Sequence, residues 1–426
     1  MLNKDGIREL AYVVNIDSIE PIEGSDNCEA AVVGGWRIMV RKETFKPGDL
    51  AVYFEIDSKV PEKPEFEFLA KKHYKVKTQK YSFGGKGNFV SQGLLMHPSD
   101  FGWTVAYDQK LDEKGFAVTD ENGDPVRDKV IGIVDDSNTL HKSDDESRFL
   151  TAQLGVKYAS ADDNKRKSSS VSKYQKMAQR HPKLGKTKWW RWLFKRTWGK
   201  KLLFVFFGKK RDSASGWPAW VSKTDEERVQ NMPWILNDKN PWIVTEKIDG
   251  TSTTFTMKRK KFGKFDFFVC SRNVVFDKPE KKCFYETNVY TEMAEKYNIE
   301  NVLKEIINKL DVDWVTIQGE TYGEGVQKRT YGIKGHDFAG FNLIDSKNGR
   351  WPSDLAMDFV KDYNIPWVPI ISKDYILPDT VDEILDFATG KSTLDNELRE
   401  GYVFRDQKGE KSFKVVSNEY IIKYHG

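Results

Sequence analysis

A single basic block constrains how this chain can fold. Residues 165–211 contain 17 Lys and Arg side chains and no Asp or Glu, whereas the whole 426-residue chain has a formal net charge of only +4. The remaining residues therefore carry a net charge of −13. The block is a concentration of charge rather than a mixed polar surface, so it marks a linker or insertion between domains. The chain is long enough for two or three domains.

The basic block is also rich in aromatic side chains. Cations interleaved with rings suit a polyanion, because Lys and Arg displace counterions from phosphates while rings stack on bases. Two alternatives remain open: a basic segment on an anionic membrane surface, or a linker whose apolar residues dock on the next domain. No stretch approaches the roughly 20 apolar residues of a membrane span, so no stable membrane insertion is expected. The aromatic residues are Trp189, Trp190, Trp192, Phe194, Trp198, Phe204, Phe206 and Phe207.

The segments on either side of the block differ in pattern. Residues 9–100 alternate in apolar character between Pro- and Gly-containing turns, which predicts an OB-like β-barrel, although another small barrel or sandwich fits the same pattern. Residues 101–160 are polar and weakly patterned. Strand-like runs outnumber helical ones after residue 217 and do not alternate with them, which predicts an α+β domain of antiparallel sheets with flanking helices. We predict an OB-like domain at 1–110, a linker or insertion at 111–216, and a catalytic domain at 217–426.

Cysteine usage indicates the compartment. Cys28, Cys270 and Cys283 are few, odd in number and widely spaced, and no Cys/His cluster accompanies them. This pattern supports neither a disulfide framework nor a zinc site. The N-terminal residues also lack the apolar run of a signal peptide. A reducing, intracellular compartment is therefore expected, either the cytoplasm or the nucleoid or nucleus.

The strongest chemical signal is the sequence Thr-Glu-Lys-Ile-Asp-Gly around Lys247. A strand-like run leads into Lys247, and in an extended segment Asp249 points to the same side. Gly250 permits a sharp turn that lets a nucleotide approach the backbone. A lysine acts as a nucleophile only when deprotonated, and a carboxylate alone opposes deprotonation, so Asp249 is expected to act through a metal ion. Taken alone, this pattern is weak and is more typical of a surface turn.

Further motifs follow in an order that resembles the covalent nucleotidyltransferases, which comprise DNA ligases, RNA ligases and mRNA capping enzymes. Lys247 matches the lysine that forms the nucleotide phosphoramidate in that superfamily. The resemblance continues through Ser271-Arg272-Asn273, Gln318-Gly319-Glu320, Phe341-Asn342, Glu400-Gly401-Tyr402-Val403 and Phe413-Lys414-Val415. It implies an ATP-grasp-like ligase domain over residues 217–426.

The N-terminal pattern resembles one branch of ATP-dependent RNA ligases, in which an OB domain precedes the transferase domain. The similarity covers most of residues 10–100 and 217–426, including VSQGLL and SKTDEERVQN. Two positions depart from the family. Val416 stands where many RNA ligases have a second lysine, so either Lys411 or Lys423 substitutes for it or the second charge is dispensable. Asn342 stands where an aspartate is common.

The resemblance implies a role for each matched residue. Lys247 attacks the α-phosphate of ATP and becomes bound to AMP, the AMP passes to a 5′-phosphate, and a 3′-OH then displaces it. Asp249, Glu320 and Glu400 form a carboxylate set for Mg²⁺ or Mn²⁺, which commonly keeps several waters. The remaining implied contacts are Lys414 at the α-phosphate, Arg272 and Glu320 at the ribose or the incoming phosphate, Phe341 stacked on adenine, Glu246 near the base edge, and Gly250 beside the nucleotide.

The implied substrate is nucleic acid, in particular a nicked duplex with an RNA 3′-OH strand, and RNA repair is the implied setting. Three alternatives remain open: a DNA ligase, a capping-type guanylyltransferase, and a non-catalytic OB-type nucleic-acid-binding protein. The sequence predicts no oligomeric state.

Overall fold

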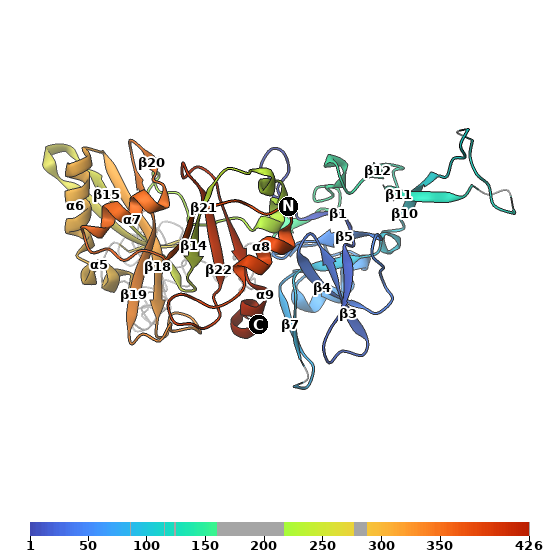
Figure 1. Ribbon diagram of the computed structural model, residues 1–426, viewed down its shortest axis with the longest axis horizontal. Coiled ribbons are helices and arrows are strands. Elements are labelled where there is room, and N and C mark those ends of the chain that lie inside the picture. The colour runs from blue at the N-terminus through green and yellow to red at the C-terminus, as the bar shows by residue number, and fades with distance from the viewer. Residues whose placement is uncertain (86, 115, 123–124, 160–216, 277–287, 426) are drawn as a thin grey trace, which may run out of the picture.

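The chain forms two lobes, with both chain ends near the place where the lobes meet, in this computed structural model (Figure 1). The structure describes residues 1–425 except 86, 115, 123–124, 160–216 and 277–287. The basic block 165–211 and Cys283 therefore lie outside the described residues. The predicted contact of the block with a polyanion stays a prediction.

The N-terminal lobe contains the short antiparallel strands that the apolar alternation predicts. They pair in the orders β1-β5-β9, β2-β3-β4 and β7-β8, and two 3-10 helices, η1 (Pro64–Lys72) and η2 (Pro98–Phe101), connect some of them. The strands are β1 (Ala11–Asn15), β2 (Ser18–Pro21), β3 (Cys28–Val33), β4 (Trp36–Arg41), β5 (Leu50–Phe54), β6 (Ser58–Lys59), β7 (Gln79–Ser82), β8 (Asn88–Ser91) and β9 (Leu94–Met96).

The central sheet of this lobe is buried on both faces. Successive side chains of a strand point to opposite faces, so Tyr53 packs with Trp36 against β3 and β4, while Val52 and Phe54 pack with Phe66 on the other side. This explains why β5 is apolar at every position instead of alternating. Each such buried side chain contributes about 1.5–3 kcal/mol of hydrophobic stabilisation.

The segment that looked weakly patterned, 101–160, also contains strands. These are β10 (Thr104–Gln109), β11 (Arg127–Val134), β12 (Leu140–His141) and β13 (Lys157–Tyr158). The β10–β11 hairpin projects away from the lobe (Figure 1) and is largely exposed, so no apolar alternation marks it. Ile133, Leu150 and Val156 nevertheless pack in the core with β1 and β5. This packing favours an N-terminal domain that extends past residue 110, and the predicted boundaries stay a prediction.

The C-terminal lobe is built on two antiparallel sheets. One has the order β21-β14-β22-β23 and the other the order β17-β16-β15-β18-β19-β20. The strands are β14 (Trp242–Lys247), β15 (Thr251–Arg259), β16 (Phe265–Ser271), β17 (Val275–Phe276), β18 (Trp314–Gly323), β19 (His336–Asp345), β20 (Gly349–Arg350), β21 (Ile370–Tyr375), β22 (Gly401–Asp406) and β23 (Ser412–Val416). This agrees with the predicted α+β class.

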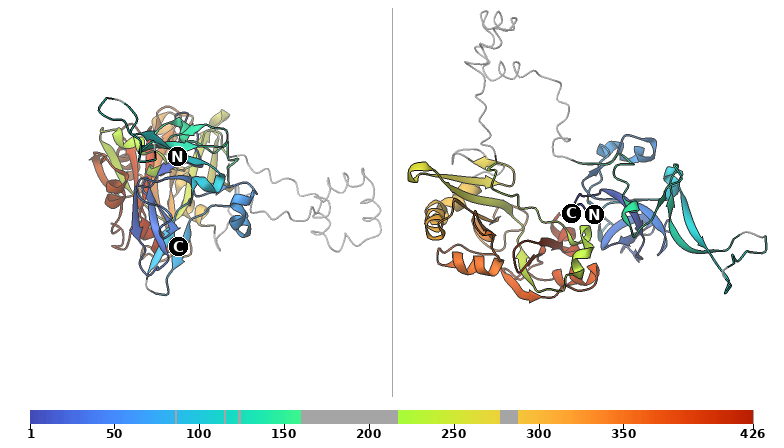
Figure 2. Two further views of the ribbon diagram at one scale, coloured as in Figure 1. Left: turned by 90° about the vertical axis from the view of Figure 1, so that its right-hand side faces the viewer. Right: turned by 90° about the horizontal axis from the view of Figure 1, so that it is seen from above.

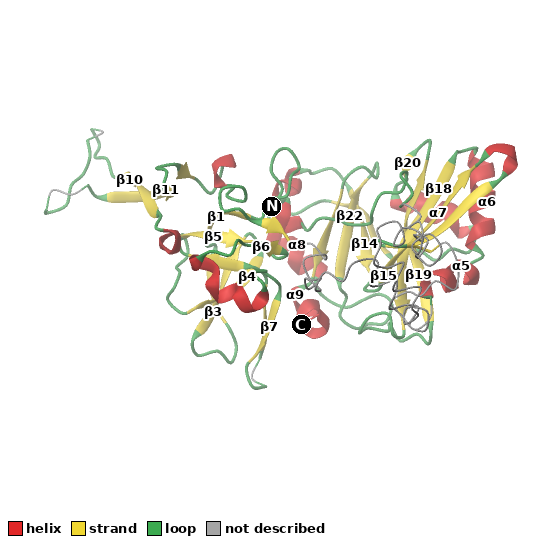
Figure 3. Ribbon diagram, turned by 180° about the vertical axis from the view of Figure 1, so that it is seen from behind, coloured by secondary structure: helices red, strands yellow, loops and turns green. Residues whose placement is uncertain are grey.

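Helices cover the outer face of the larger sheet, as the views from behind and above show (Figures 2 and 3). They are α5 (Val289–Lys296), α6 (Ile299–Leu310) and α7 (Ser353–Lys361), while α8 (Val381–Ala388) packs on the smaller sheet. Helix α6 buries residues at helical spacing, including Ile299, Leu303 and Ile306, against β15 and β18. The sequence has a helical pattern over residues 286–298, 300–310 and 379–389, and α5, α6 and α8 form there. Helix α7 and strand β21, whose apolar positions are partly exposed, were not predicted.

Several contacts join the lobes. The Arg228 guanidinium lies 5.5 Å from the ring centre of Trp36, and the Leu2 amide donates to Asn231 O at 2.7 Å. The end of the chain, α9 (Asn418–Tyr420) and η8 (Ile421–His425), packs Ile421 against Val90 of β8. Among the described residues, no helix is long and apolar enough to cross a membrane.

Candidate active site

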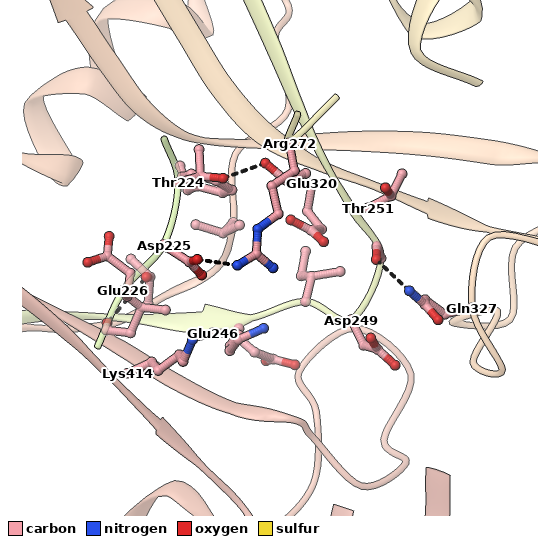
Figure 4. Close-up of a pocket in the computed structure, with 18 of the residues that line it drawn as sticks. Thr224, Asp225, Glu226, Glu246, Asp249, Thr251, Arg272, Glu320, Gln327 and Lys414 are labelled. Carbon is pink, nitrogen blue, oxygen red and sulfur yellow. Dashed lines mark hydrogen bonds and ion pairs between the residues drawn. The ribbon is translucent and has the colours of Figure 1, made fainter. Parts of the chain in front are cut away.

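A cavity of about 350 Å³ lies between the two sheets of the C-terminal lobe (Figure 4). Strands β14, β22 and β23 supply one wall, strands β15, β18 and β19 the other, and residues 224–226 close one side. The residues that line it include Thr224, Asp225, Glu226, Glu246, Lys247, Asp249, Gly250, Arg272, Glu320, Gln327, Phe341, Arg405 and Lys414. All the predicted site residues except Glu400 are in this lining, and Glu400 contacts Lys247 directly.

Lys247 is the last residue of β14, where it pairs with Gly401 of β22. That register brings the preceding residue, Glu400, beside it, with the Lys247 Nζ 2.7 Å from the Glu400 carboxylate. Burial lowers the pKa of Lys247, but the charges of Glu400, Glu320 and Asp249 together raise it above its usual value. The amine is therefore held as an ammonium, and an additional positive charge is needed to release its proton.

Asp249 and Gly250 follow Lys247 in a turn that is fixed by hydrogen bonds. The Asp249 amide donates to Tyr331 Oη at 2.7 Å, and Gln327 Nε2 donates to Gly250 O at 3.0 Å. A Cβ on Gly250 would lie 2.3 Å from Thr321 O, so no side chain fits there. The glycine is thus required for the close approach of this turn to β18. This contact could not be predicted from the sequence.

The carboxylate of Glu320 interacts with the charges of Lys247, Glu400 and Asp249. Burial raises the pKa of Glu320 to about 8, since the opposing effect of Lys247 is offset by Glu400 and Asp249. Such a group binds a cation readily, because a cation restores its ionised form. Within the described part of the chain, no three His, Cys, Asp or Glu side chains lie close enough to hold a metal together. Carboxylate oxygens are the donor type that Mg²⁺ or Mn²⁺ prefers.

Lys414 is a further cation of the pocket. It lies on β23, and burial together with the charges of Lys247 and Arg228 lowers its pKa to about 8. The two candidates for a further lysine lie elsewhere: Lys411 pairs with Asp238 at 2.9 Å and Lys423 with Glu397 at 2.8 Å. Neither of them lines the pocket, so Lys414 is the lysine that the motif contributes.

Arg272 reaches across the pocket and forms an ion pair with Asp225 (Figure 4). Both side chains are more than half exposed, at 56% and 57%, so solvent screens the pair and it contributes little to stability. The pair leaves Arg272 able to turn to a phosphate. Its planar guanidinium donates two parallel hydrogen bonds to phosphate oxygens, which suits such an exchange.

Glu246 and Phe341 were predicted to contact the base. The Glu246 carboxylate is buried and accepts hydrogen bonds from Ser392 Oγ, from the Thr393 amide at 2.9 Å and from Thr393 Oγ1 at 2.7 Å. It therefore anchors the loop before β22. Phe341 is half-buried in the pocket wall, with the Arg405 guanidinium 5.7 Å from its ring centre.

Replacing Phe341 by leucine tests its contact with the base. The expected result is a roughly 10-fold weaker apparent affinity for the nucleotide with the maximal adenylation rate nearly unchanged, because stacking of a base on a ring contributes about 1–3 kcal/mol. Single-turnover formation of the covalent adenylate at varied ATP measures both quantities. An unchanged apparent affinity would assign Phe341 to packing alone.

Several residues of the pocket were not predicted from the sequence. Thr224 Oγ1 lies 2.5 Å from Ser252 Oγ, and Arg405 Nη1 donates to Thr245 Oγ1 at 3.2 Å while its guanidinium lies 3.5 Å from Glu226. Residues 224–226 belong to the SKTDEERVQN stretch, which carried part of the family resemblance. The family resemblance was the sequence feature that could have identified these residues, because a polar segment without periodicity does not predict which side chains line a pocket.

A pocket of this kind defines a class of enzyme. A lysine that must lose its proton, surrounded by carboxylates and close to further cations, is suited to attack a phosphate and keep the nucleotide covalently. Covalent nucleotidyltransferases work in this way.

Comparison with known proteins narrows the class. A family model for RNA ligase matches residues 240–425, and an OB-fold domain model matches residues 10–97. Residues 240–425 thus match an RNA ligase domain, residues 10–97 match an OB-fold domain, and the chain is an RNA-joining enzyme. No curated protein sequence matches it.

Solved structures agree with this assignment. A Naegleria gruberi RNA ligase with pyrophosphate is 26% identical, with a TM-score of 0.60 over 98% of this chain and 99% of that one. A variant of that ligase with ATP and Mn is 26% identical with a TM-score of 0.59 over the same shares. Another variant, with AMP and Mn, is 25% identical with a TM-score of 0.59.

Proposed function

We propose that this RNA ligase uses ATP and a divalent cation to join a 3′-OH to a 5′-phosphate through an AMP bound to Lys247. The observation that carries the proposal is the position of the Lys247 amine, 2.7 Å from Glu400 in a pocket that also contains Lys414 and Glu320. The Naegleria relatives with ATP or AMP and Mn support the choice of nucleotide and cation.

The first step is attack by the neutral Lys247 amine on the α-phosphate of ATP. A P–N bond forms, the bond to the bridging oxygen breaks, and pyrophosphate leaves with the electron pair. Glu400, which accepts from Lys247, is placed to take the proton. Lys414 stabilises the charge that builds on the α-phosphate oxygens.

The second and third steps use the same residues on nucleic acid. A 5′-phosphate oxygen displaces Lys247 from AMP, which forms a 5′–5′ pyrophosphate bridge. The 3′-OH then attacks the 5′-phosphate, and AMP leaves. Arg272 suits the incoming 5′-phosphate, because its current partner Asp225 holds it only in an exposed ion pair.

The bound cation supplies charge that lowers the pKa of Lys247 and stabilises the phosphate oxygens. Asp249, Glu320 and Glu400 are the residues that would hold it. Their oxygen donors and the raised pKa of Glu320 fit a hard cation with part of its water shell retained.

The substrate we propose is a nicked duplex with an RNA 3′-OH strand. Between Lys71 and Lys80 the N-terminal lobe carries five lysines and no acidic residue, and all but Lys75 are exposed. The Lys80 Nζ donates to Ile422 O at 2.8 Å, which places this basic segment beside the C-terminal element of the catalytic lobe. A row of cations there suits the phosphates of a duplex arm.

Replacing Lys71 and Lys77 together by glutamine should weaken duplex binding and reduce its dependence on salt. Each lost phosphate contact lowers the slope of log K against log salt by about 0.9, so a drop of about 2 is expected. Fluorescence anisotropy at several salt concentrations measures it. The control replaces Lys110 and Lys129, exposed lysines of the β10–β11 arm. An equal effect of both pairs would show only a general charge effect.

The nucleotide and the strand requirement are tested separately. Purified protein is incubated with α-labelled ATP or GTP and Mg²⁺ or Mn²⁺, and then with nicked duplexes carrying an RNA or a DNA 3′-OH strand. We expect label from ATP and sealing at the RNA strand. Label from GTP alone would indicate a capping enzyme, sealing only of DNA would indicate a DNA ligase, and no label would indicate a non-catalytic binding protein.

The thiols fit a reducing, intracellular compartment, which we keep as part of the proposal. Among the described residues, Cys28 and Cys270 are free thiols. Burial raises the pKa of the Cys270 thiol to about 12, so it stays protonated and unreactive.

A further inference from the structure

The side chain of Asp249 is held by the last helical segment of the chain. The Tyr420 Oη donates to Asp249 Oδ2 at 2.8 Å, while the backbone amide of Asp249 donates to Tyr331 Oη. Tyr420 is fully buried and Asp249 is 6% exposed. No step of the proposed reaction uses Tyr420, although it is bonded to a carboxylate of the site.

Tyr420 has little freedom to move. Its amide donates to Ser417 Oγ at 3.3 Å, and its ring centre lies 4.6 Å from that of Tyr424. The Arg329 guanidinium lies 5.8 Å from the ring of Tyr420 and 4.1 Å from that of Tyr331. An ion pair with Asp395 fixes Arg329 in turn.

The segment that carries Tyr420 is also docked on the N-terminal lobe. Ile421 packs with Val90 and Val416, and Lys80 donates to Ile422 O. Figures 1 and 3 both show β7 of the N-terminal lobe beside α9. The OB lobe thus supports the element that holds Asp249.

The phenol of Tyr420 is a hydrogen-bond donor to one oxygen of the Asp249 carboxylate. A donor on Oδ2 fixes the orientation of the carboxylate. Such partners of metal-binding carboxylates typically contribute 10- to 100-fold to metal affinity or activity.

We infer that Tyr420 is a positioning residue that orients Asp249 toward the divalent cation. The inference rests on the proposed function, since it takes Asp249 as one of the carboxylates that hold the cation. Tyr420 itself touches neither nucleotide nor metal in this role.

The test compares Tyr420→Phe with Tyr424→Phe in the full-length protein. Phenylalanine keeps the ring contacts of Tyr420 and removes only its hydroxyl, while Tyr424→Phe removes a hydroxyl from the same segment without contacting Asp249. Electron paramagnetic resonance of free Mn²⁺, with an ATP analogue that has carbon at the α,β bridge, gives the Mn²⁺ affinity without any reaction. The rate of adenylate formation at varied Mn²⁺ gives the second readout.

We expect Tyr420→Phe to weaken Mn²⁺ binding about 10- to 100-fold, with the adenylation rate largely recovered at saturating Mn²⁺. Tyr424→Phe should match the wild type. Unchanged Mn²⁺ affinity in Tyr420→Phe would overturn the inference, as would a rate loss that saturating Mn²⁺ does not repair. A wild type that binds Mn²⁺ but forms no adenylate would instead overturn the proposed function.

Discussion

Replacing Lys247 by alanine is expected to abolish formation of the covalent enzyme–AMP adduct, with a fall of at least roughly 10³-fold in its rate. The loss of a covalent nucleophile has effects of this scale because no other group occupies its position. Labelled ATP followed by denaturing electrophoresis measures it. Lys247 is partly buried against Glu400, so the variant also leaves that carboxylate without its cation.

A matched control separates chemistry from folding. Lys411 is an exposed lysine paired with Asp238 outside the pocket, and Lys411→Ala should label like the wild type. Thermal unfolding should show that Lys247→Ala is folded, and the variant should still seal a substrate that is supplied with its 5′-adenylate preformed. Full labelling of Lys247→Ala would overturn the assignment of the nucleophile.

The strands and the motif residues were largely predictable because each depends on local pattern. The runs around Lys247 and Tyr402 are continuous and apolar, and they form β14 and β22. Their pairing was not predictable from pattern, since it joins segments more than 150 residues apart, as the Lys247–Glu400 contact shows. Only the family resemblance connected these two positions before the structure did.

The hydrogen-bond partners of the site residues could not be predicted from the sequence for the same reason. The carboxylate of Glu246 is bonded to Ser392 and Thr393, and that of Asp249 to Tyr420. Polar residues in loops and short helices show no periodicity, so nothing in the sequence indicates which of them turn toward the pocket. The resemblance named the residues that meet the nucleotide but not those that hold them.

Replacing Lys414 by methionine should have opposite effects on activity and stability. Methionine has a similar volume without the charge, so adenylate formation should fall about 10²- to 10³-fold, the usual effect of removing one group that stabilises transition-state charge. Stability should rise instead, because burial and two neighbouring cations disfavour the ammonium and lower the pKa of Lys414 to about 8. Active sites often keep such groups at the expense of stability.

The stability gain has a defined pH dependence. The unfolded lysine titrates near its ordinary pKa, and the folded one at about 8, so at pH 7 the folded state bears the full cost of the charge, at most about 3 kcal/mol. That cost fades as the pH rises from about 8 toward the unfolded pKa, because the folded lysine becomes neutral first. Lys414→Met should therefore melt above the wild type at pH 7 and approach it near pH 10.

Thermal unfolding of Lys414→Met, Lys423→Met and the wild type at several pH values measures this dependence. Lys423 is exposed and paired with Glu397, so its replacement removes no buried charge and should not raise the melting temperature. A fall in stability for Lys414→Met at pH 7 would mean that Glu400 and Asp225 compensate the charge fully. In that case Glu400 and Asp225 stabilise the charged Lys414, and only the lower activity of Lys414→Met would show that the lysine takes part in the reaction.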